Sequence, residues 1–154
     1  MPLSNNTEII SKLQRFCLYQ TRCKEDVRQK LISLNVKEHL HKNIIDDLEN
    51  DGFIDESGFL TEFITGKFRN KKWGKQKIKA HLISKKIEPE KIDACLSLIN
   101  DDEYIKTIFY LIDNKSKDLN GQTLINKRIK LSRYLIQKGF APNEFLSILD
   151  SSLE

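Results

Sequence analysis

The strongest constraint on this chain is a pattern of apolar residues that occurs three times along it. The first copy consists of Val27, Leu31, Ile32 and Val36. The second copy lies 51 residues further on and the third a further 53, with an apolar residue at all four positions. These copies consist of Ile78, Leu82, Ile83 and Ile87, and of Leu131, Leu135, Ile136 and Phe140. A spacing of four residues is typical of a helix face, and recurrence at a nearly constant interval is typical of tandem structural repeats.

The residues at the end of each copy predict the same turn. Asn35, Lys86 and Gly139 stand directly before the last apolar residue of the three copies. Asn and Gly tolerate the left-handed conformation that ends a helix, whereas Lys adopts it less readily. Pro89 and Pro142 follow two residues after that last apolar residue, and Pro is favoured in the first turn of a helix. Each copy therefore predicts a helix, a tight turn and a second helix; the alternative is a chance coincidence among periodic helices.

A further helix is expected before each helix pair, because apolar stripes of helical period precede the copies. These helices are expected at about residues 7–20, 56–71 and 101–117. The sparse Gly and Pro content, six and three residues, also favours helices over an all-β fold, which needs frequent turns. We therefore predict an all-α fold, a tandem array of three three-helix, helix-turn-helix-like repeats, elongated or curved. The repeats are expected to span residues 7–54, 55–100 and 101–153.

Charged residues are concentrated in separate segments, although the net charge is only +4. Residues 38–62 contain eight Asp and Glu and one Lys, whereas residues 67–91 contain ten Lys and Arg and two Glu. A second basic segment, residues 115–138, contains seven Lys and Arg and one Asp. Segments of one sign can steer an oppositely charged partner. The acidic segment is interpreted as a solvated face with helix caps, because it lacks the ligand register of a calcium-binding loop.

The basic segments supply the candidate binding residues. In the first segment these are Lys67, Arg69, Lys71, Lys72, Lys75, Lys77 and Lys79. In the second they are Lys127, Arg128, Lys130 and Arg133. Such cations can neutralise phosphates or meet an acidic protein face, and the alternative is a solvated lysine-rich helix surface. Trp73 could stack on a base, but we expect it to pack in the core between repeats, because Gly74 suggests a tight turn under the ring.

No motif in the sequence indicates catalysis or a bound cofactor. There is no Gly-rich phosphate loop, nucleophile elbow or paired metal motif. The spacing of Cys17, Cys23, His39 and His41 does not match a common zinc site. The apolar runs are shorter than the ~18 residues that span a bilayer, and the N-terminus does not resemble a secretion signal. We therefore expect a non-enzymatic, monomeric protein of the cytoplasm that contacts no membrane.

Three segments resemble the RecX family. Arg22–Leu31 resembles the start of a family helix, with Cys23 in place of the usual Ser cap. Asp51-Gly52-Phe53-Ile54-Asp55, followed by Phe59 and Phe63, resembles the family's linker and next helix, with Leu60 where Ala is usual. Phe68–Ile78, which contains Trp73-Gly74, resembles its basic segment and turn. The resemblance is strongest over residues 12–100.

This resemblance implies a modulator, usually an inhibitor, of the RecA recombinase in DNA repair, recombination and the SOS response. It implies binding along the groove of the RecA–DNA filament, with weak and non-specific contact to single- or double-stranded DNA. The positions expected to be structural are Gly52, Phe53, Phe59, Phe63, Trp73 and Gly74, with the repeated leucines Leu31, Leu82 and Leu135. Two alternatives remain open: a helix-turn-helix transcriptional regulator that binds DNA directly, and a helical-repeat adaptor for another protein.

Overall fold

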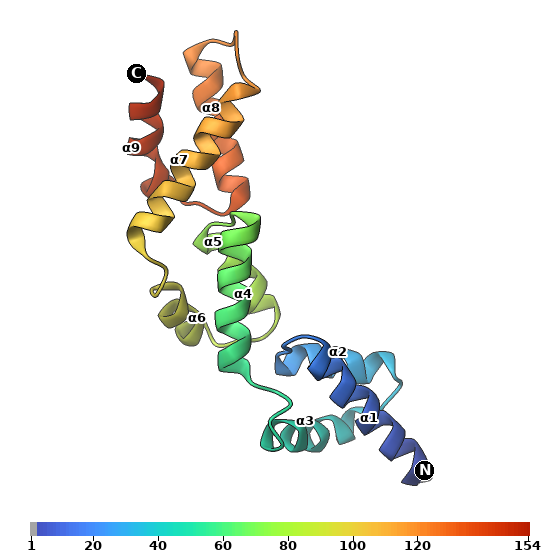
Figure 1. The fold of residues 1–154 in the computed structure, drawn as a ribbon. Helices are drawn as coiled ribbons and strands as arrows, with labels where there is room; N and C mark the ends of the chain where they lie inside the picture. The colour runs from blue at the N-terminus through green and yellow to red at the C-terminus, as the bar shows by residue number, and fades with distance from the viewer. Residues whose placement is uncertain (1–2) are drawn as a thin grey trace. The chain divides into compact units, whose positions relative to one another are not determined.

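The structure is a computed structural model that describes residues 3–154, and these residues form helices and no β-strand (Figure 1). The helices are α1 (Leu3–Tyr19), α2 (Lys24–Ser33), the short 3-10 helix η1 (Glu38–Leu40), α3 (His41–Asn50), α4 (Glu56–Lys71), α5 (Lys75–Ser84), α6 (Pro89–Leu96), α7 (Asp101–Lys117), α8 (Leu124–Lys138) and α9 (Pro142–Leu153). The predicted all-α fold is confirmed. Within residues 3–154, every helix is too short or too polar to cross a bilayer.

The helix boundaries agree with most of those predicted. The helices expected at 56–71 and 101–117 are α4 and α7, while α1 begins at Leu3, before the expected residue 7. Helix α8 begins at Leu124. Thr123 accounts for this start, because its Oγ1 accepts a hydrogen bond of 3.2 Å from the Asn126 N–H and caps the helix.

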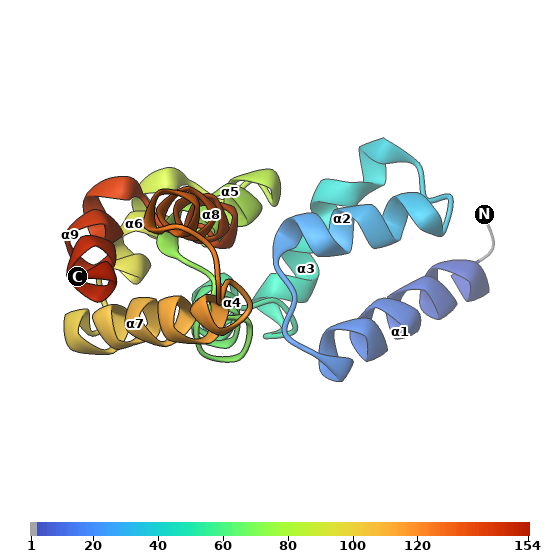
Figure 2. The same cartoon turned by 90° about the horizontal axis from the view of Figure 1, so that it is seen from above.

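The chain divides into two compact units, Met1–Phe63 and Ile64–Glu154, and α4 runs across the division. In the first unit, α2 packs against both α1 and α3 around a core that includes Leu13, Leu31 and Leu48 (Figure 2). In the second unit, α5 packs against α6, and α7, α8 and α9 pack against one another. The division into repeats at 7–54, 55–100 and 101–153 stays a prediction.

The predicted turn is present in all three copies. The backbone angle φ is +60° at Asn35, +61° at Lys86 and +104° at Gly139, so each residue adopts a positive φ. Each of these residues donates its N–H to the carbonyl three residues back, at 2.9–3.0 Å. The next N–H bonds to the carbonyl five residues back, which is the pattern of a Schellman cap. Pro89 and Pro142 then begin α6 and α9, as their positions predicted.

The repeated apolar positions do not all lie in the core. Leu31, Leu82 and Leu135 are completely buried, as are the residues four positions before them. The isoleucines that directly follow these leucines are exposed by 46%, 46% and 53% in the three copies. Successive side chains of a helix point about 100° apart, so the neighbour of a fully buried residue turns toward solvent. The third position is thus apolar in every copy without being a core position.

The linker between α3 and α4 has the conformation that its sequence suggests. Gly52 adopts φ of +84°, and Phe53 packs against the core of the first unit. Asp55 Oδ1 accepts a hydrogen bond of 3.1 Å from the Gly58 N–H and so caps α4. Phe59 is buried and Phe63 is half-buried, with their ring centroids 5.6 Å apart.

Candidate nucleic-acid interface

Trp73 is the centre of the most concentrated group of cations in the second unit. Helix α4 ends at Lys71, and Lys72 adopts a positive φ of +58° that turns the chain toward α5. This turn leaves the Trp73 ring half-buried, 4.6 Å between centroids from the His81 ring on α5. The ammonium groups of Lys67 and Lys77 lie 4.9 and 4.5 Å from the indole centroid, at cation–π distance.

Trp73 is therefore not the core residue that its sequence context suggested. A residue packed between repeats would be buried, whereas this ring keeps one part on the surface among lysines. The tight turn that Gly74 indicated does exist, but the ring lies over the α5 surface instead of inside the core.

Lys138 brings a cation from the third predicted repeat into the same group. Its ammonium donates a hydrogen bond of 2.9 Å to the Lys71 carbonyl. Partial burial lowers the pKa of Lys138, and the positive charges of Lys77, Lys71 and Lys72 lower it further. The pKa of His81 is lowered in the same way, first by burial and then by lysine neighbours that include Lys85. We name this group the Trp73 cluster: Lys67, Lys71, Lys72, Lys77, Lys85 and Lys138, with Trp73 and His81.

Lys85, Lys138 and His81 were not among the residues predicted from the sequence. Lys85 and Lys138 stand directly before Lys86 and Gly139, so they occupy equivalent positions of the second and third copies of the repeat. Comparison of charged positions between copies would have indicated both lysines.

Three cations of the first basic segment lie away from the Trp73 cluster. Arg69 forms an ion pair with Glu103 at 3.0 Å, and Lys79 forms one with Asp93 at 2.7 Å. The Lys75 ammonium lies 4.7 Å from the centroid of the Tyr104 ring. The segment covers one helix end, a turn and the start of another helix, so its side chains point in different directions. These three side chains contact α6 and α7.

The second basic segment lies along α8. Arg128 bonds to Asp150 of α9 at 2.8 Å, and this bond lowers the pKa of the Asp150 carboxyl. Lys127 is half-buried, and Lys130 and Arg133 are exposed. These four basic residues of α8 remain candidates for partner binding. The charge of Arg128 is already balanced by the Asp150 carboxylate.

Two glycines position Lys138 within the Trp73 cluster. The Gly74 N–H donates to the Lys138 carbonyl at 2.8 Å, and the Gln76 N–H donates to the Gly139 carbonyl at 3.0 Å. A Cβ atom on Gly74 would lie 2.4 Å from the carbonyl carbon of Gly139. Gly74 itself has an ordinary φ of −77°. Glycine is therefore required at position 74 because the turn at Gly139 approaches so closely. The backbone conformation at position 74 would allow other residues.

Cys17, Cys23 and His41 of the first unit are buried, whereas His39 is exposed. Cys17 and Cys23 are buried, and burial raises the pKa of the Cys17 thiol. His41 is buried as well, with Nε2 bonded to the Val36 carbonyl at 2.8 Å. In the described part of the chain, no three His, Cys, Asp or Glu side chains are grouped so that they could hold a metal ion.

The fold and this surface define a class of protein: an all-α chain of helix–turn–helix units that presents a cationic, tryptophan-containing surface. Comparison with known families gives the particular relationship. Residues 55–96, which include most of the Trp73 cluster, match the family model described as RecX, second three-helix domain. The resemblance to the RecX family is thus confirmed, and the chain is a relative of the proteins of that name.

Individual relatives agree with this assignment. The chain is similar to the protein named Regulatory protein RecX of Lactococcus lactis subsp. lactis, with 33% identity over 99 residues, 63% of this chain and 37% of that protein. It is also similar to the protein of the same name from Clostridium acetobutylicum, with 30% identity over 132 residues, 83% of this chain and 61% of that protein. The chain thus spans only about half the length of these curated relatives.

Solved structures agree on the fold. A crystal structure of regulatory protein RecX superposes with a TM-score of 0.84 at 21% identity, covering 94% of this chain and 71% of that one. The crystal structure of RecX from Lactobacillus salivarius superposes with a TM-score of 0.78 at 23% identity, covering 96% and 97% of the two chains.

Proposed function

We propose that this chain is a non-catalytic regulator of the RecA recombinase, which binds the RecA–DNA filament and inhibits its activity. The observation that carries the proposal is the match of residues 55–96 to the RecX family, whose curated relatives are named regulatory proteins. The same residues contain Trp73 and five of the six lysines of its cluster. The segment that relates the chain to its family is therefore also the one that carries its most concentrated charge.

The electrostatics of the Trp73 cluster suit an anionic partner. The pKa of Lys138 and the pKa of His81 are both lowered in part by surrounding lysines, which means that positive charges repel one another there. An approaching phosphate or carboxylate relieves this repulsion and displaces counterions, and both effects favour binding. The indole of Trp73 holds Lys67 and Lys77 at the surface, so part of their conformational entropy is already lost before a partner arrives.

The proposal is tested by RecA filament stability on single-stranded DNA, with and without this protein. We expect the protein to shorten filament lifetime at low salt. The double variant Lys67→Gln/Lys77→Gln should fold normally and lose most of this effect. The matched control Lys91→Gln/Lys106→Gln removes two exposed lysines of the same unit that lie outside the cluster, and should act like the parent. Unchanged filaments at several-fold molar excess of the parent protein and low salt would refute the proposal.

Direct reading of a DNA groove is less well supported. A helix-turn-helix reader places its base-contacting residues on the last helix of the unit. Helix α9 contains no Lys or Arg, and α3 and α6 contain one Lys each, Lys42 and Lys91. The cations lie instead on α4, α5 and α8, which favours a filament or backbone contact. A duplex footprint with clear sequence preference would reverse this conclusion.

A further inference from the structure

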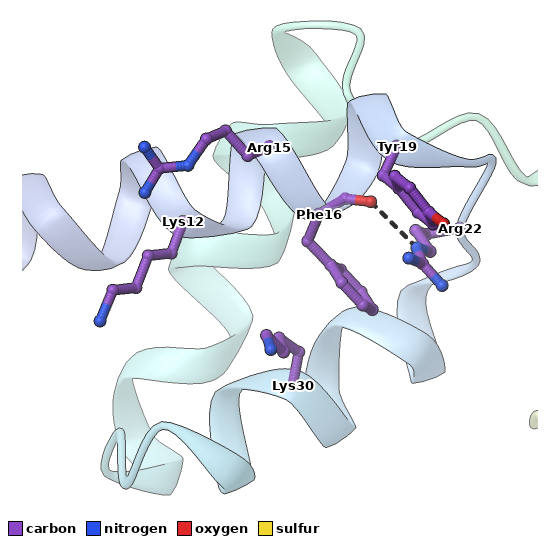
Figure 3. A pocket seen from close by; sticks show the side chains of 6 residues that line it. All are labelled: Lys12, Arg15, Phe16, Tyr19, Arg22 and Lys30. Carbon is purple, nitrogen blue, oxygen red and sulfur yellow. Dashed lines mark hydrogen bonds between the residues drawn. The ribbon is translucent and has the colours of Figure 1, made fainter.

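The first unit contains a second group of cations and aromatic rings, separate from the Trp73 cluster. An open pocket of about 310 Å³ lies between α1, the turn after it, and α2. Its lining consists of Lys12, Arg15, Phe16, Tyr19, Arg22 and Lys30 (Figure 3). This volume is at the lower end of the range for small-ligand sites. The lining residues include four cations and no carboxylate.

Two other cations of this region are paired with carboxylates. Lys24 forms an ion pair with Glu49 at 3.3 Å, and Arg28 forms one with Glu25 at 2.5 Å. The two acidic residues between positions 12 and 30, Glu25 and Asp26, do not line the pocket. The pocket therefore concentrates positive charge without a carboxylate of its own to balance it, and a ligand of matching charge would be anionic.

The two aromatic rings of the pocket have different environments. The Arg22 guanidinium lies 3.6 Å from the Phe16 ring centroid, and its Nε donates to the Phe16 carbonyl at 3.0 Å. The Lys30 ammonium lies 5.4 Å from the same centroid, so Phe16 holds two cations in place. Tyr19 is 83% exposed at the end of α1. In Figure 3, Tyr19 and Arg22 lie at one end of the pocket and Lys12 at the other.

We propose that this pocket binds a nucleotide of single-stranded nucleic acid. The ammonium and guanidinium groups of Lys12, Arg15 and Lys30 neutralise the backbone phosphates, and the exposed ring of Tyr19 stacks on a base. Cations that follow the backbone beside an aromatic ring that stacks on bases are the two elements of single-strand binding. A duplex keeps its bases inside, so it cannot use Tyr19 in this way. An acidic peptide would satisfy the cations but would gain little from the ring.

This inference goes beyond the proposed function, because it requires no recombinase. The assay is fluorescence anisotropy of a labelled oligothymidylate and of an abasic strand of equal length, titrated with the full chain. Both titrations are also carried out in the Lys67→Gln/Lys77→Gln background, where the Trp73 cluster contributes less. If the protein does not bind the oligothymidylate, the result of the filament assay is unaffected. If the protein has no effect on RecA filaments, its binding to the oligothymidylate can still be measured.

Two pocket variants give separate expectations. Tyr19→Ala removes the stacking surface, so we expect binding of oligothymidylate to weaken at least about five-fold while binding of the abasic strand hardly changes. Lys12→Gln/Arg15→Gln should weaken both strands and reduce the salt slope of log affinity by about 1.4, because each phosphate contact on a single strand contributes about 0.7.

The control Lys37→Gln/Lys42→Gln removes the same charge from exposed positions of the unit outside the pocket, and should bind like the parent. Circular dichroism checks that each variant keeps its helices. The inference is overturned if Tyr19→Ala affects the two strands equally. It is also overturned if a polyglutamate peptide of equal charge displaces the labelled strand from the parent protein as effectively as unlabelled oligothymidylate does.

Discussion

Gly139 shows how a single residue can be required for two reasons at once. Its φ of +104° lies beyond the values of Asn35 and Lys86 at the equivalent turns, which are close to +60°. A Cβ atom at Gly139 would lie 2.4 Å from Lys77 Cβ and 2.9 Å from the Gly74 carbonyl oxygen. Asn and Lys can serve in the first two copies because the left-handed conformation alone costs only about 1–2 kcal/mol. In the third copy, the close approach of another turn excludes any side chain.

Alanine substitution separates these two requirements. Gly121 also has a positive φ, +85°, but has nothing within 4 Å of its Cβ position, so Gly121→Ala should cost about 1 kcal/mol of unfolding free energy. Gly139→Ala adds the steric clash, and we expect a loss of at least about 2 kcal/mol. Urea denaturation followed by circular dichroism measures both losses. Equal losses would mean that the contact between the two turns relaxes without cost.

Among the elements, α7 connects the helices of the second unit through Tyr104. Its hydroxyl accepts a hydrogen bond of 3.0 Å from the Lys75 N–H, the first residue of α5, and donates one of 3.1 Å to Glu144 of α9. Glu144 in turn accepts a hydrogen bond of 2.8 Å from the Ala141 N–H and so caps α9. The Tyr104 ring also packs against Phe68 and Phe140, at centroid distances of 5.7 and 5.1 Å. One side chain of α7 therefore caps α5 and orients the cap of α9.

Removal of this hydroxyl should lower stability in a pH-dependent way. Tyr104→Phe leaves the Lys75 N–H without its acceptor, which should cost about 1 kcal/mol near neutral pH. Burial raises the pKa of Tyr104, so the folded state favours the neutral phenol. The stability that the neutral phenol contributes is fully present below about pH 10, the pKa of tyrosine in the unfolded chain. It is lost as the pH rises from there through the raised pKa of the folded state.

Thermal unfolding midpoints measured between pH 7 and pH 11 test this sign. The midpoint of the parent should fall more steeply above pH 10 than that of Tyr104→Phe, since only the parent carries the buried phenol. Parallel curves would show that ionisation of Tyr104 is not coupled to unfolding.

At the scale of the whole chain, three groups of cations are candidates for binding a partner: the Trp73 cluster, the pocket of the first unit, and the α8 residues Lys127, Arg128, Lys130 and Arg133. The α8 residues were predicted as the second candidate surface, after the first basic segment. Arg128 is balanced by Asp150 there, whereas the Trp73 cluster contains six lysines. A concentrated positive potential binds a polyanion more strongly than the same charges dispersed or paired.

This difference predicts an order among variants. Lys67→Gln/Lys77→Gln should weaken the binding of single-stranded DNA and of RecA filaments more than Lys127→Gln/Lys130→Gln does, although both remove two charges. Titrations at two salt concentrations measure the difference, which should be larger at low salt because screening is weaker there. The reverse order would place the main binding surface on α8.

Local signals in the sequence were sufficient for the helices and for the turns between them. The apolar period, the residues Asn35 and Gly139 before the last apolar position, and the prolines after it predicted the helix–turn–helix units correctly. They succeed because helical period and turn conformation depend on residues within a few positions of one another. The family resemblance was also visible in the sequence, since its motifs are continuous segments.

The composition of the binding surfaces depended on tertiary structure. Neither the arrival of Lys138 beside Lys71 nor the pairing of Lys79 with Asp93 follows from a local pattern. Both depend on how helices distant in sequence pack, and Lys138 reaches the cluster because Gly74 and Gly139 let two turns touch. A lysine-rich sequence determines how much positive charge the chain carries. Packing between helices decides which of those charges gather on one surface, because each side chain's neighbours come from other parts of the chain.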